Sequence, residues 1–121
     1  MCGDDDDINH IDEELFKRFI KSASKLGVLP DTKATNAHLD ITSEKDRSNY
    51  MDSLFKAGLT RAVNDATSLH QGDKMDVIAG QAIVFARLSG LLAGQFPPGS
   101  DLFHTIVNAL MQGHKEAEKL T

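Results

Sequence analysis

The most distinctive hydrophobic pattern in the chain runs from Asp73 to Phe96. When this stretch is wound as an α-helix, its side chains sort by size onto opposite faces. The small residues fall at heptad spacing on one face: Ala79, Ala82, Ala86, Ser89 and Ala93. The bulky residues cover most of the other side: Val77, Val84, Phe85, Leu88, Leu91 and Leu92. Only a narrow stripe around Arg87 is polar, and such a helix is typical of the buried centre of an all-α bundle.

Three more segments carry an apolar stripe at helical spacing, and each is bounded by residues that start or stop helices. The first runs from about His10 to Leu26, the second from about Ser43 to Leu69, and the last follows Ser100. The predicted N-caps of the four helices are Asn9, Ser43, Asp73 and Ser100. Gly27 is predicted to end the first helix in a left-handed conformation.

A short turn around Gly72 joins the second helix to the central one. Short turns make antiparallel neighbours, so we expect a long helical hairpin over residues 43–69 and 73–96. Small residues recur at every fourth position of the second helix: Gly58, Ala62 and Ala66. We expect this small face to pack against Ala79, Ala82 and Ala86. The predicted fold is therefore all-α, a four-helix bundle-like single domain over residues 10–121.

The N-terminal residues 1–9 contain four adjacent carboxylates, Asp4 to Asp7. Such a run repels itself and stays hydrated, so we predict a disordered acidic tail. A calcium-binding EF-hand alternates its ligands and needs a mid-loop Gly and a closing Glu, and this run has neither. Asp31 to Thr42 lacks helical period and is predicted to be a surface loop.

Composition narrows the classes of partner and compartment. The net charge is −5 and no Lys/Arg cluster is present, so we expect neither nucleic-acid nor membrane binding. The one cysteine, Cys2, cannot form an intrachain disulfide and fits a reducing compartment. No apolar run follows Met1, so no secretory signal is visible. The predicted location is the cytoplasm.

The central stretch is close to the roughly 20 apolar residues that a membrane span needs. Arg87 lies in its middle, where a charge costs about 2.5–3.5 kcal/mol on insertion. We therefore predict a buried helix of a soluble protein rather than a span.

The sequence contains no recognisable catalytic or metal-binding motif. His104 and His114 lie ten residues apart, or about 15 Å along a helix, and cannot hold one metal ion together. No HExxH, nucleophile elbow or phosphate loop is present. We predict no catalytic residue, no metal and no cofactor.

The segment from Pro97 to Leu120 is similar in pattern to a helix of small quorum-sensing antiactivators carried on rhizobial plasmids. The likeness consists of Pro97-Pro98, then Asp101-Leu102, then an apolar helix ending in His114-Lys115, and it covers about a fifth of the chain. The resemblance implies an antiactivator-like regulator that binds a transcription factor, and no functional residue is carried over.

The main hypothesis for function is a helical protein–protein interaction module that forms a homodimer, because the apolar surface exceeds what one bundle needs. The candidate interface residues lie on the first and last helices: Phe16, Phe19, Phe103, Val107 and Met111. The alternative is a bundle that binds a small molecule or metal between helices, including as an enzyme. A cavity lined by Phe85, Phe103 and His104 would support this alternative.

Overall fold

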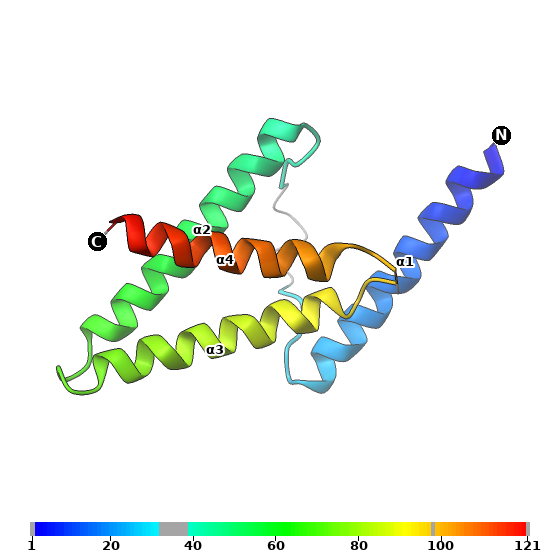
Figure 1. Ribbon diagram of the computed structural model, residues 1–121. Helices are drawn as coiled ribbons and strands as arrows, with labels where there is room; N and C mark the ends of the chain where they lie inside the picture. The colour runs from blue at the N-terminus through cyan, green and yellow to red at the C-terminus, as the bar shows by residue number, and fades with distance from the viewer. Residues whose placement is uncertain (1, 32–38, 98, 121) are drawn as a thin grey trace. The chain divides into compact units, whose positions relative to one another are not determined.

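The computed structural model describes residues 2–31, 39–97 and 99–120, with side chains from Asp12 onward. These residues form four helices and no strand (Figure 1). The helices are α1 (Cys2–Lys25), α2 (Glu44–Thr67), α3 (Lys74–Ala93) and α4 (Leu102–Leu120). The all-α class that the sequence predicts is confirmed.

Helix α1 begins at Cys2, earlier than the predicted start at His10. The apolar stripe marks only the part of a helix that packs, and carboxylates are favourable at the positive N-terminal end of a helix. The boundary read from the stripe is therefore too late. Disorder of the acidic run in solution stays a prediction.

Helix α1 ends as the sequence predicts. Gly27 has φ 86°, in the left-handed region. The amide of Val28 donates to the carbonyl of Ala23 at 2.9 Å, and that of Gly27 donates to Ser24 at 3.0 Å. These two bonds form a Schellman motif, which satisfies carbonyls that the helix itself leaves open.

The chain divides into two compact units, where the sequence predicts one domain over residues 10–121. Unit 1 comprises Met1–Pro30 and Ala86–Thr121, and unit 2 comprises Asp31–Phe85. Helix α3 contributes its N-terminal part to unit 2 and its C-terminal part to unit 1.

Unit 2 is a helical hairpin made of α2 and the first turns of α3. Ser43 caps α2, as predicted, because its hydroxyl accepts from the amide of Asp46 at 3.1 Å. After the turn, the Lys74 ammonium donates to the carbonyls of Ala66 (2.8 Å) and Thr67 (3.2 Å). These carbonyls lie in the last turn of α2, beyond the reach of the regular i+4 helical bonds, and that of Ala66 also accepts from the Leu69 amide at 3.3 Å. Lys74 therefore closes the hairpin at its turn.

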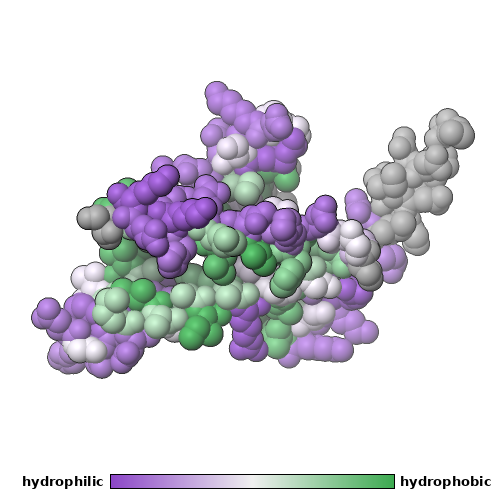
Figure 2. Space-filling model, viewed as in Figure 1, coloured by the Kyte–Doolittle hydropathy of each residue, from purple (hydrophilic) through white to green (hydrophobic). Residues whose placement is uncertain are grey.

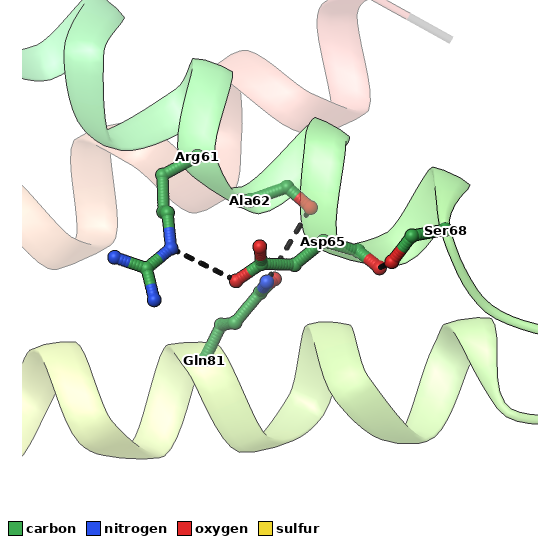
Figure 3. Close-up of polar contacts among 5 residues, drawn as sticks. All are labelled: Arg61, Ala62, Asp65, Ser68 and Gln81. Atoms are coloured by element: carbon green, nitrogen blue, oxygen red, sulfur yellow. Dashed lines mark hydrogen bonds and ion pairs between the residues drawn. The ribbon is translucent and has the colours of Figure 1, made fainter.

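A second link joins the two helices further from the turn. Figure 3 shows Gln81 reaching from α3 to α2, where its Nε2 donates to the carbonyl of Ala62 at 3.3 Å. The Arg61–Asp65 ion pair lies beside this contact, with 3.0 Å between Nε and Oδ2. The contacts of α3 with α2 thus come from positions such as 74 and 81, two turns apart on one side of the helix.

The predicted packing of small faces is wrong for α3. On α2, Ala66 is buried and Ala62 is half-buried, but Ala79 and Ala82 on α3 are exposed. The bonds made by Lys74 and Gln81 turn a different side of α3 toward α2. A prediction that matches the faces of two helices by side-chain size alone does not give the rotation of α3 about its own axis.

Unit 1 contains α1, the end of α3 and α4. The Arg18 guanidinium donates to the carbonyl of Gly94 at 2.9 Å, just beyond the last turn of α3. Helix α4 begins at Leu102, and the amide of Thr105 bonds to Asp101, so Asp101 rather than the predicted Ser100 occupies the cap position.

Burial of apolar side chains is low throughout the described residues. Ala66, at 8 % exposure, is their one buried hydrophobic residue. None of the residues of α3 or α4 is buried. Figure 2 shows apolar surface lying open along α3. The prediction of a buried central helix is therefore wrong for this chain by itself.

Candidate interaction surfaces

The first surface is a ridge on α4, in unit 1. Four large apolar side chains lie on one side of the helix, and we call them the α4 face: Phe103, Val107, Leu110 and Met111. Phe103 is 71 % exposed and Leu110 is 62 % exposed. Leu102 and Ile106, on the adjoining side, are half-buried. The apolar arc of α4 is therefore wider than its half-buried part.

The second surface is a groove of about 410 Å³ in unit 1, between α1 and the end of α3. We call it the α1 groove, and its lining is Asp12, Leu15, Phe16, Phe19, Leu92, Gln95 and Phe96. Phe16 is 62 % exposed, whereas Phe19 is half-buried. Three aromatic rings with few polar groups suit the apolar part of a ligand or a protein side chain.

One polar group of the α1 groove lacks a partner. The Nε2 of Gln95 donates to the carbonyl of Leu91 at 3.0 Å, but its Oε1 is buried without a hydrogen bond among the described residues. An unsatisfied buried acceptor costs about 1–3 kcal/mol. A small rotation of this amide toward the groove would let a bound donor satisfy it.

The third surface, which the sequence did not predict, is a groove of about 410 Å³ in unit 2. Its exposed walls are Leu59 and Val63 on α2 and Met75 and Ile78 on α3. Met75 and Ile78 have i, i+3 spacing and follow the turn directly, which was the available signal. Whether Met75 and Ile78 lie beside α2 depends on how α3 is rotated about its own axis. The i, i+3 spacing does not define this rotation.

The candidate interface residues fall into two groups within unit 1. Phe103, Val107 and Met111 share the α4 face, and Phe16 and Phe19 share the α1 groove. Their role as an interface stays a prediction. The alternative cavity lined by Phe85, Phe103 and His104 stays a prediction, because Phe85 belongs to unit 2 and the other two residues belong to unit 1.

The charged and metal-binding chemistry of the described residues is sparse. Within them, no group of three or more His, Cys, Asp or Glu side chains could hold a metal ion. The pKa of Asp40, in the loop before α2, is lowered because its carboxylate accepts from the Thr42 hydroxyl and amide. This carboxylate lies outside all three surfaces.

Helix α3 is long and apolar enough to cross a membrane, judged by its length and composition alone. None of this stretch is buried. Arg87, which the sequence places in its polar stripe, is exposed. The absence of membrane binding stays a prediction.

Comparison with known proteins assigns no family. No protein-family model matches the chain, and no curated protein and no solved structure is significantly similar to it.

Proposed function

We propose that this protein is a small cytoplasmic interaction module that forms a homodimer and binds another protein. The observation that carries the proposal is the exposed α4 face on a helix whose adjoining side chains, Leu102 and Ile106, are already half-buried. A transcription factor is the partner class implied by the antiactivator resemblance of residues 97–120.

The energetics support association over an isolated chain. Burying one large apolar side chain stabilises by about 1.5–3 kcal/mol, and the α4 face offers four of them. Large contiguous apolar patches on soluble proteins mark interaction sites or aggregation hazards. A closed two-fold dimer covers one patch on each copy with the same contact.

Sedimentation equilibrium over a range of micromolar concentrations tests the proposal. We expect the wild-type mass to rise from monomer to dimer. Phe103→Glu should shift the equilibrium to monomer, because it places a charge on the α4 face. Asn108→Glu, an exposed change on another side of α4, is the matched control and should leave the dimer intact. A monomer mass at every concentration would contradict the proposal.

The α1 groove supports a second candidate function, the binding of an apolar small molecule. Its volume of about 410 Å³ lies within the range of ligand pockets, and its lining is mostly aromatic and aliphatic. Fluorescence titration with 8-anilinonaphthalene-1-sulfonate should show saturable binding that Phe16→Ala weakens. Val28→Ala, an exposed apolar change outside the groove, is the control. Equal binding by both variants would remove this candidate.

A further inference from the structure

The α4 face is part of a longer seam along the helix. Phe103, Val107, Leu110, His114 and Ala117 follow one another at alternating steps of four and three residues. This is the a/d spacing by which two helices pack along each other. All five residues are exposed. The seam runs through most of α4, from Leu102 to Leu120.

We infer that α4 packs antiparallel against α4 of a second copy, about a two-fold axis close to Met111. This inference rests on the proposed homodimer and names its interface. The seam is bulky at its N-terminal end, with Phe103 and Val107, and smaller and more polar at its other end, with His114 and Ala117. An antiparallel pair places large residues opposite small ones. A parallel pair places Phe103 on Phe103 and His114 on His114.

The charges beside the seam favour the same arrangement. His104 and Glu118 flank the seam on one side, two heptads apart, and Met111 is their midpoint. A two-fold axis there brings His104 of each copy close to Glu118 of the other. The imidazole N–H donates to a carboxylate in either protonation state. The Glu118 carboxylate also lies 3.6 Å from the His114 imidazole in its own helix, and a carboxylate accepts at both of its oxygens.

The area of this contact sets the expected strength. Four large side chains from each copy, at about 100 Å² each, bury about 800 Å² in total. This is below the roughly 1,000 Å² of a stable interface, so the α4 pair forms a weak dimer at micromolar concentration.

A membrane surface is a poorer fit for the α4 face. Interfacial helices are rich in Lys and Arg, whereas α4 balances Lys115 and Lys119 against Glu116 and Glu118.

Spin-label distances in the full chain test the pairing directly. Single cysteines at Thr105, Gln112 and Lys119, in a Cys2→Ser background, lie on the outer face of α4 one heptad apart. In the antiparallel pair, the two labels at Gln112 are closest. With the axis at Met111, the two labels are offset along the helix by about 3 Å at Gln112, about 18 Å at Thr105 and about 24 Å at Lys119. Equal distances at all three sites would overturn the inference in favour of a parallel pair.

A charge exchange provides an independent test, read as the dimer dissociation constant in sedimentation. His104→Glu should weaken the dimer about fivefold, because it repels Glu118 of the other copy. Adding Glu118→Lys to His104→Glu should restore the affinity. A dimer unaffected by His104→Glu would overturn the axis near Met111.

The outcomes separate this inference from the proposed function. A dimer mass with the wrong label distances refutes the antiparallel α4 pair and leaves the homodimer standing. A monomer mass throughout refutes both. Flotation of the wild-type chain with uncharged phosphatidylcholine vesicles, abolished by Leu110→Glu but not by Gln112→Glu, would show that a membrane covers the α4 face and would overturn the inference.

Discussion

Two side chains of α3, Lys74 and Gln81, determine how the hairpin of unit 2 closes. Both donate to backbone carbonyls of α2, at Ala66 and Thr67 for Lys74 and at Ala62 for Gln81. The sequence indicated the turn and the cap at Ser43, since these depend on local residue types. It did not indicate bonds from one helix to the next, because a lysine or glutamine reaches many carbonyls and only the tertiary arrangement selects one.

Lys74→Met keeps the aliphatic stem and removes the ammonium, so it tests the closure of the hairpin. We expect a loss of about 1 kcal/mol in the free energy of unfolding, because two helix-terminal carbonyls lose a charged donor. Lys56→Met is the control, since Lys56 makes an exposed pair with Asp52 and should change stability by less than about 0.5 kcal/mol. Urea denaturation measures both, and equal effects would contradict the role of Lys74.

At the scale of the helices, stripes and stop signals predicted most of the architecture. The Schellman motif at Gly27 and the range of α2 followed from residue types within a few positions of each boundary. The rotation of α3 about its own axis did not follow, because α3 is apolar on nearly every side. A helix with only a narrow polar stripe gives no single direction for its neighbour. The α4 face could be predicted because α4 is clearly two-sided.

The rotation of α3 makes a testable difference at Ala82. Packing of the small faces predicts that Ala82→Leu destabilises by about 1–3 kcal/mol. Because Ala82 is exposed, we now expect a change within about 0.5 kcal/mol. Ala66→Leu, at the buried position, should cost about 1–3 kcal/mol. Chemical denaturation of the two variants measures this contrast. A large loss of stability in Ala82→Leu would mean that the small faces of α2 and α3 do pack together.

Gly27, which follows the end of α1, and Gly58, which lies within α2, should respond in opposite directions to alanine. Gly27→Ala should lower the free energy of unfolding by about 1 kcal/mol, because φ is 86° and alanine is strained there. Gly58→Ala should raise it by about 0.4–1 kcal/mol, since nothing lies within 4 Å of the added methyl and the unfolded chain loses freedom. Thermal melts followed by circular dichroism measure both. A loss at Gly58 would indicate that another chain approaches it closely.

For the whole molecule, the exposed apolar helix α3 makes membrane binding the main alternative to a soluble dimer. We expect the wild-type chain to stay in solution with anionic vesicles, because its net charge of −5 is repelled. Centrifugal flotation at low ionic strength measures this. The flotation of the wild-type chain is compared with that of Arg87→Leu, a variant that lacks the central charge of α3. Wild-type chain floating with the vesicles would contradict the expectation.

The exposure of most of the large apolar side chains among the described residues has a consequence for calorimetry. The heat-capacity change on unfolding comes mainly from hydrating apolar surface that the folded state hides. A compact chain of 121 residues would show about 1.5–1.8 kcal/mol/K. With Ala66 as the one buried hydrophobic residue described, we expect a dilute chain to fall well below this value. Association hides more of that surface, so the heat-capacity change and the melting temperature should both rise with protein concentration in differential scanning calorimetry.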